Sequence, residues 1–338
     1  MKSPFVSVVI PTLNAASVLE ECLEAISKQD YPEDKVEIVV ADGGSTDGTV
    51  ALAEKYGARV VENKLKTGEA GKAVGVKAAQ GDLVALIDSD NILPSKNWFR
   101  RMVEPFEDPE IVGSEPWKYT WRTEDGFIDR YCALMGMNDP FCYFTGNYDR
   151  LNVLSGKWTG LDLEEEDKGR WLKVTLSKKG IPTIGANGTM LRRSFLEEVG
   201  VGDYLFDIDL LASAVEDRGE LKFAKVKVGI IHLYCGSNIS KFVRKQRRRV
   251  RDFLYHEKVG DRDYPWQEYN RGGIIKFVAS CVTILPLIYQ TVKGFLKKPD
   301  FAWLFHPLAC WATLWVYGWG RVRGFFSVSE LSREGWGQ

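Results

Sequence analysis

Two carboxylates, Asp88 and Asp90, directly follow the apolar run of residues 83–87. Such a run is typical of a strand buried on both faces, and parallel sheets bind ligands at the carboxyl ends of their strands. Two aspartates this close repel each other unless a cation offsets their charge. Mg²⁺ and Mn²⁺ suit the arrangement because they take few carboxylates and complete their shell with phosphate oxygens and water. The spacing predicts a divalent metal site, with a solvated turn as the plainer alternative.

The preceding residues alternate between short apolar runs and helical patterns. Strands are expected at residues 5–10, 36–41, 59–62 and 83–87, with helices at 17–28, 49–56 and 71–79. This alternation predicts an α/β fold with a mostly parallel, doubly wound sheet. Three polar loops, at residues 11–14, 42–45 and 88–91, would then meet at one sheet edge. Carboxylates, glycines and a metal at such an edge suit a nucleotide.

These motifs resemble glycosyltransferase family 2, whose members have the GT-A fold. The matching stretches are VVIPTLN at 8–14, VVADGGSTDGT at 39–49, GKA at 71–73, AQGD at 79–82 and DSD at 88–90. The resemblance implies a nucleotide-sugar donor, with UDP favoured, and a divalent metal, Mn²⁺ or Mg²⁺. By analogy, Asp90 binds the metal and Asp88 reaches the metal or the ribose. The residues implied in nucleotide-sugar binding are Pro11, Thr12, Asn14, Asp42, Gly43, Lys72, Asp88 and Ser89.

A second resemblance concerns the acceptor side of the family's site. Residues 184–195 resemble the segment that precedes the catalytic acid, and residues 204–211 follow. Inverting members carry Glu-Asp-x-Asp-Leu here, whereas this chain has Phe206 in place of the first acid, so the implied base is Asp207. Asp209 is the alternative base, or merely a helix cap. His232, after an expected strand at 224–231, completes the metal shell in many GT-A enzymes, or simply ends the strand.

Composition bears on the protein's partners and on its cellular location. Forty-five basic and 46 acidic residues give a net charge of −1, so no global charge favours nucleic acid. The six cysteines form no C-x-x-C pair, which favours reduced thiols. Residue 1 is followed directly by a strand-like run with no signal-peptide pattern, so we expect the catalytic part to face the cytoplasm.

The C-terminal third carries features of a membrane protein. A basic stretch at 241–251 includes Gln246, Arg248 and Arg249, which resemble the Q-x-x-R-W element of processive family members with Val250 in place of tryptophan. We expect these three to bind phosphate or lipid head groups. Apolar runs at 274–296 and 301–320 suggest a helical hairpin; if both runs cross, the lysines of the turn at 297–298 lie outside. Helices in the interface, or a buried pair, are alternatives.

The sequence therefore predicts a GT-A catalytic domain at 1–235, with a nucleotide-sugar-binding half (1–112) and an acceptor half (113–235). A basic juxtamembrane segment (236–272) and a membrane-associated hairpin and tail (273–338) follow. The predicted function is transfer of a sugar from a nucleotide-sugar to a lipid-linked acceptor, a polyprenyl or dolichyl phosphate or diphosphate, at the cytoplasmic face of the cell membrane. Rivals are a polyprenyl-phosphate sugar synthase resembling dolichyl-phosphate mannosyltransferase, a non-catalytic membrane-bound scaffold, and a nucleotidyltransferase.

Overall fold

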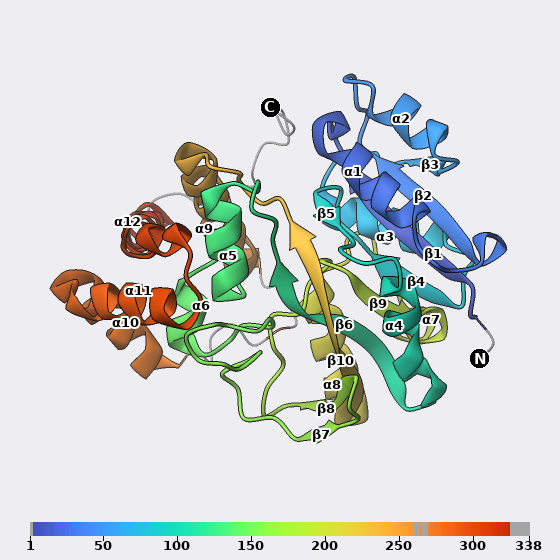
Figure 1. Ribbon diagram of the computed structural model, residues 1–338. Coiled ribbons are helices and arrows are strands. Elements are labelled where there is room, and N and C mark those ends of the chain that lie inside the picture. Colours follow the sequence, from blue (N-terminus) through green and yellow to red (C-terminus); the bar gives the residue numbers. More distant parts are fainter. Residues whose placement is uncertain (1–2, 260–263, 265–269, 325–338) are drawn as a thin grey trace. The chain divides into compact units, whose positions relative to one another are not determined.

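The computed structural model describes residues 3–259, 264 and 270–324 (Figure 1). The chain forms two compact units. The first contains the residues up to Trp117 together with Asp162–His232, and the second contains Lys118–Leu161 and the described residues from Leu233 onward. Residues 118–161 fall in the same compact unit as the described C-terminal helices.

The first unit begins with the expected strand–helix alternation. Strands β1 (Val6–Thr12), β2 (Val36–Asp42), β3 (Arg59–Glu62) and β4 (Leu83–Leu86) are parallel, in the order β3-β2-β1-β4. Helices α1 (Ala16–Ser27), α2 (Thr49–Lys55) and α3 (Gly68–Ala78) connect them, and Figure 1 shows this part in blue to cyan. Val9 pairs with both Val39 and Leu86, and all three side chains are fully buried. A strand buried on both faces accounts for the continuous apolar runs.

The sheet continues with antiparallel strands, so it is mixed. Strand β9 (Thr189–Arg192) pairs antiparallel with β4, and the order continues through β6 (Ile111–Thr120), β10 (Glu220–His232), β8 (Trp171–Ser177) and β7 (Glu165–Asp167). The short strand β5 (Asn91–Ile92) pairs with the end of β10. The remaining elements of this unit are the short helices η1 (Glu33–Lys35), α4 (Trp98–Val103), η2 (Glu104–Glu107) and α7 (Arg193–Val199), and helix α8 (Asp207–Arg218).

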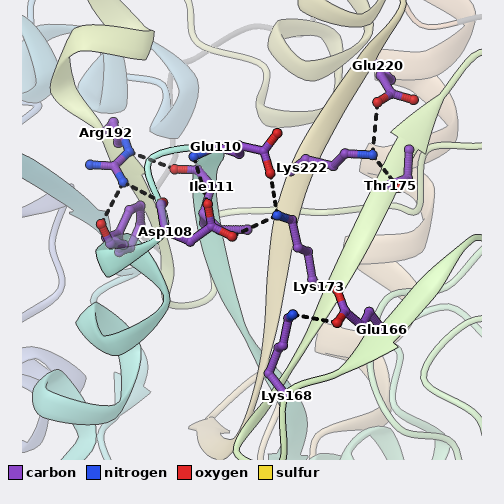
Figure 2. A network of polar contacts seen from close by, with 11 residues as sticks. Asp108, Glu110, Ile111, Glu166, Lys168, Lys173, Thr175, Arg192, Glu220 and Lys222 are labelled. Atoms are coloured by element: carbon purple, nitrogen blue, oxygen red, sulfur yellow. Dashed lines mark hydrogen bonds and ion pairs between the residues drawn. The ribbon is translucent and has the colours of Figure 1, made fainter.

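Charged side chains hold this antiparallel part together. The Arg192 guanidinium donates to the backbone carbonyl oxygens of Phe106, Asp108 and Ile111 at 2.7–2.9 Å, which ties β9 to the turn before β6 (Figure 2). Figure 2 also shows Lys173 of β8 pointing between the carboxylates of Asp108 and Glu110, at 2.7 and 2.5 Å. These contacts tie β8 and β9 to the turn that precedes β6.

The second unit is helical. Its elements are α5 (Phe127–Met135), α6 (Phe141–Thr145), α9 (Ile239–Val259), α10 (Arg271–Thr283), α11 (Leu285–Lys297), η3 (Phe301–Phe305) and α12 (His306–Gly324). Aromatic rings fill its core, where Tyr131 packs edge-on against Trp303 and Phe305. Most of the aromatic residues of 119–148 are buried or half-buried in this unit.

The expected single helix over 274–296 is two helices. Ile284 adopts a left-handed conformation with φ of 58°, and α10 and α11 meet there at a bend of 94°. Pro286 lies in the first turn of α11, where its missing N–H is tolerated, and it would break a continuous helix. Within the described residues, no single helix is long and apolar enough to span a membrane; the bent pair qualifies only when its two helices are taken together.

Candidate active site

The first site loop is built by β1 and β2, whose last residues are paired neighbours. Asp42 ends β2 and is buried, and its carboxylate accepts hydrogen bonds from Thr12 Oγ1 at 2.9 Å and from the backbone N–H groups of Gly44 and Ser45 at 2.8 Å. Asn14, in the left-handed region at φ of 50°, accepts from the N–H of Thr46 through its Oδ1. The loop is therefore rigid before any ligand binds.

Helix α3 lies unusually close to this loop. A Cβ atom on Gly71 would lie 2.7 Å from Pro11 Cβ, so only glycine allows the approach. A Cβ on Gly43 would meet Lys66 Cα at 3.3 Å, which makes the second loop similarly tight. This packing brings Lys72, one residue after Gly71, to the same edge of the sheet.

The predicted Asp-x-Asp turn follows β4. Asp88, Ser89 and Asp90 are all partly exposed, and the buried side chain of Asn91 holds the turn by accepting from the Asp88 N–H at 3.1 Å. Asn91 also donates to Asn187 Oδ1 at 3.0 Å, in the segment before β9. The sequence contained both asparagines but gave no signal of their pairing, because 96 residues separate them.

The structure brings His232 to this turn. The pairing of β5 with β10 sets His232 opposite Asn91, and His232 Nε2 lies 3.5 Å from Asp90 Oδ1. Burial, and after it the charge of Asp90, raise the pKa of Asp88 to about 6, while Lys72 and His232 oppose the rise. Among the described residues no three His, Cys, Asp or Glu side chains form a ligand set by themselves. The donors suit a cation whose other ligands are phosphate oxygens and water.

Lys72 and Asp207 form an ion pair that the sequence did not indicate. Asp207 is the first residue of α8, Lys72 lies in α3, and their side chains are 13% and 8% exposed. Burial favours neutral Lys72, but attraction to Asp207, Glu69 and Asp88 raises its pKa. Burial also raises the pKa of Asp207, and Lys72 opposes this effect. Lys72 contacts Oδ2, whereas Oδ1 is buried and accepts no hydrogen bond.

The neighbours of Asp207 explain its placement. The N–H of Leu205 donates to the carbonyl oxygen of Glu69 at 3.0 Å, which fixes the start of α8 against the start of α3. Phe206, which stands where the family pattern has an acid, stacks on Tyr204 with ring centroids 6.1 Å apart. Asp209, the alternative base, is buried within α8.

The basic stretch lies in α9 of the second unit. Gln246 is fully buried, donates to the Asn138 carbonyl oxygen at 2.8 Å, and accepts from Arg249 at 2.8 Å. Arg249 also lies 3.5 Å from Asp139, and its guanidinium remains partly exposed. Arg248 is exposed, 3.9 Å from Asp252. Gln246 therefore supports Arg249 from the interior, while the two arginines are accessible to anions.

Comparison with solved structures identifies the fold. A mannosyltransferase from Pyrobaculum calidifontis, solved with GDP-Man and Mn²⁺, superposes with a TM-score of 0.53 at 18% identity, over 94% of this chain and 88% of that one. The likeness shows the fold alone, and the fold is GT-A.

Sequence comparison gives matches to glycosyltransferases. Residues 7–154 match the family model described as Glycosyl transferase family 2. Glycosyltransferase AglE of Haloferax volcanii is 30% identical over 40% of this chain and 46% of its own length. A dolichyl N-acetyl-alpha-D-glucosaminyl phosphate 3-beta-D-2,3-diacetamido-2,3-dideoxy-beta-D-glucuronosyltransferase of Methanococcus voltae is 32% identical over 32% of this chain and 37% of its own length. The chain thus matches less than half of each of these relatives.

Proposed function

We propose that the protein is a metal-dependent, inverting glycosyltransferase that moves a sugar from a nucleotide-sugar, preferably a UDP-sugar, to a lipid-linked acceptor at the cytoplasmic face of the cell membrane. The observation that carries the proposal is the meeting of Asp42, Asp88 and Asp207 at one sheet edge, with the Lys72 charge acting on the last two. A donor loop, a metal turn and a base are the three parts that this reaction needs.

The donor would bind along the ends of β1, β2 and β4. Asp42, Thr12 and Asn14 hold the first site loop in shape, so that it can receive the base or ribose of the donor. Pro11 and Gly43 would form the floor of this donor site, and Ser89 would offer a hydroxyl to the diphosphate.

Asp90, with Asp88 and His232, would hold Mn²⁺ or Mg²⁺. A bound divalent cation would neutralise the repulsion between the two carboxylates and stabilise the charge that develops on the departing nucleoside diphosphate. His232, at 3.5 Å from Asp90, favours a first-row transition metal such as Mn²⁺ over calcium, because these metals accept imidazole as a ligand more readily.

Asp207 would act as the base. As the acceptor hydroxyl attacks the anomeric carbon, its proton passes to Asp207 Oδ1, and the bond to the nucleoside diphosphate breaks on the opposite face of the sugar. The unpaired, buried Oδ1 supports this role, since it is an acceptor with no competing donor. Lys72 opposes the rise in the Asp207 pKa that burial causes, which favours the ionised form of the carboxylate.

A lipid-linked acceptor is supported by two observations. The Methanococcus voltae relative is named for transfer to a dolichyl-linked sugar phosphate. In this chain, the partly exposed Arg249 and exposed Arg248 offer guanidinium groups to a phosphate or lipid head group.

A thermal-shift screen tests the donor and the metal together. UDP, GDP, CDP and TDP are added with and without Mn²⁺; a nucleotide at 100 times its Kd adds about 2.7 kcal/mol of stability. We expect one nucleotide to raise the Tm only with metal, and Asp90→Ala to remove that effect while the exposed control Asp34→Ala keeps it. Absence of any shift would favour a scaffold.

The base is tested by Asp207→Asn, with Asp217→Asn on the exposed end of the same helix as control. Asp207→Asn should retain the nucleotide-dependent Tm shift and lose transfer, because asparagine cannot take the proton. Full transfer by this variant would refute the assignment and favour a phosphate acceptor, which needs no base, as in a polyprenyl-phosphate sugar synthase.

A further inference from the structure

The second unit exposes a broad apolar surface on α10, α11, η3 and α12. Large apolar side chains point outward where a water-soluble surface would carry polar ones: Val282 and Leu285 are 72% and 71% exposed, and Trp315 is 70% exposed. On α12, Leu308, Trp311, Trp315 and Trp319 share one face at helical spacing. A contiguous surface of this kind marks an interaction site.

Both ends of the bent α10–α11 pair are attached to one segment, residues 118–161. At the start of α10, Gly273 packs so closely on this segment that a Cβ would lie 2.5 Å from the Phe144 carbonyl oxygen. At the end of α11, Lys297 Nζ donates to the carbonyl oxygens of Val153 and Leu154 at 3.2 and 2.9 Å. The pair therefore leaves the body of the unit and returns to it on the same side.

The turn after α11 is attached in the same way. Lys298 lies over the ring of Trp121, 5.6 Å from its centroid, and Asp300 pairs with Arg130 of α5 at 3.1 Å. The start of α10 and the turn at residues 297–300 both contact residues 118–161. These contacts do not agree with the expected hairpin, in which residues 297–298 lie on the far side of a membrane.

The apex of the bent pair is long enough to enter one lipid leaflet but too short to cross a bilayer. No charged residue occurs between Lys276 and Lys293, and the bend at Ile284 lies between them. At 1.5 Å rise per residue and a bend of 94°, each limb projects about 9–10 Å beyond its lysine. Half of a hydrocarbon core is about 15 Å, so the apex enters one leaflet and stops within it.

Charge identifies the occupant of this surface as a bilayer with anionic head groups. From Arg271 to Gly324 the sole acidic residue is Asp300, which is neutralised by Arg130. On α9, which packs along α12, Arg244, Arg247, Arg248 and Arg251 are exposed on one helical face. Basic residues near a lipid surface and tryptophans at its interface are the side chains that such surfaces favour.

We propose that α10 and α11 form a wedge that enters a single leaflet of an anionic membrane from one side, with the tryptophan face of α12 lying in the interface. The inference deepens the membrane location in the proposed function and rests on it. Its tests measure binding and sidedness rather than transfer, so failure of the glycosyltransferase proposal and failure of the wedge give different results.

Flotation with vesicles tests the apex. The full chain, freed of detergent in the presence of phosphatidylcholine vesicles with or without phosphatidylglycerol, should float, and more strongly with the anionic lipid. Val282→Glu with Leu285→Glu should weaken binding at least tenfold at an unchanged Tm, because both side chains are exposed; Leu65→Glu, an exposed apolar residue of the first unit, should bind as the wild type does. Equal binding by the apex variant would overturn the proposal.

A dimer is the competing occupant. The contrary outcome is that the wild type binds no vesicles and instead sediments as a dimer, and that the apex substitutions dissociate that dimer. In that case the surface is an interface between two copies and the wedge is wrong.

Cysteine labelling decides between a wedge and a spanning hairpin. Pro299→Cys and the control Lys157→Cys, both exposed in the second unit, are treated with an impermeant maleimide in inverted membrane vesicles and in spheroplasts. Five native cysteines are buried and Cys142 is half-buried, so background labelling should be low. The wedge predicts labelling of both positions from the same side. Labelling of the two from opposite sides would overturn it.

Discussion

Replacement of Lys72 by methionine should destabilise the first unit strongly. The change leaves the Asp207 carboxylate 13% exposed and without its cationic partner. Removing one member of a buried ion pair costs about 3–5 kcal/mol. For a domain of this size, about 3 kcal/mol corresponds to a loss of about 6–12 °C in Tm. The measurement is thermal unfolding followed by tryptophan fluorescence at pH 8.

The matched control lies on the same helix. Lys77 pairs with Asp203 at 3.6 Å, but the two side chains are 50% and 84% exposed, so Lys77→Met should cost less than about 1 kcal/mol. The double variant Lys72→Met with Asp207→Asn should recover much of the lost stability, because no unpaired charge remains buried.

The loss caused by Lys72→Met should also depend on pH. Burial already raises the pKa of Asp207, and removal of Lys72 raises it further. A folded-state pKa above the unfolded value means that the folded protein binds the extra proton, so stability falls as pH rises through this range. The deficit relative to wild type should therefore be larger at pH 8 than at pH 5. A Lys72→Met variant as stable as Lys77→Met at pH 8 would refute the reasoning.

Three further changes test other parts of the structure. Burial lowers the pKa of His306 to about 4. Between pH 6.5 and 4 the unfolded chain therefore takes up a proton that the folded chain does not, and the free energy of unfolding should fall by about 3 kcal/mol. A wild-type Tm that is no more sensitive to acid than the Tm of His306→Gln would contradict this. Gly75→Ala would place a Cβ 2.3 Å from Val9 Cγ1 and should lower stability by about 1–3 kcal/mol in denaturant unfolding, whereas an unchanged midpoint would show that α3 shifts freely. Asn91→Ala should weaken Mn²⁺ affinity about 10–100-fold in a titration with nucleotide, because Asn91 holds the Asp88 turn; equal affinity would place the metal elsewhere.

The sequence predicted the parallel half of the sheet because its signals are local. Apolar runs of strand length, polar loops at their ends and helical periodicity lie within a few residues of one another, so β1, β2, β4 and the loops at Asp42 and Asp88 could be placed without distant contacts. The family pattern is equally local. The antiparallel half carries fewer such signals, since its strands pair across long separations.

The tertiary structure alone decided which side chains meet. Lys72 and Asp207 are 135 residues apart and pair because α8 docks on α3, and His232 reaches Asp90 because β5 pairs with the end of β10. The bend at Ile284 had one local signal, Pro286, but its consequence depends on contacts of Gly273 and Lys297 with a distant segment. The composition of residues 274–296 shows only that the segment is apolar. The packing of its two ends determines whether it crosses a membrane or returns to the side on which it began.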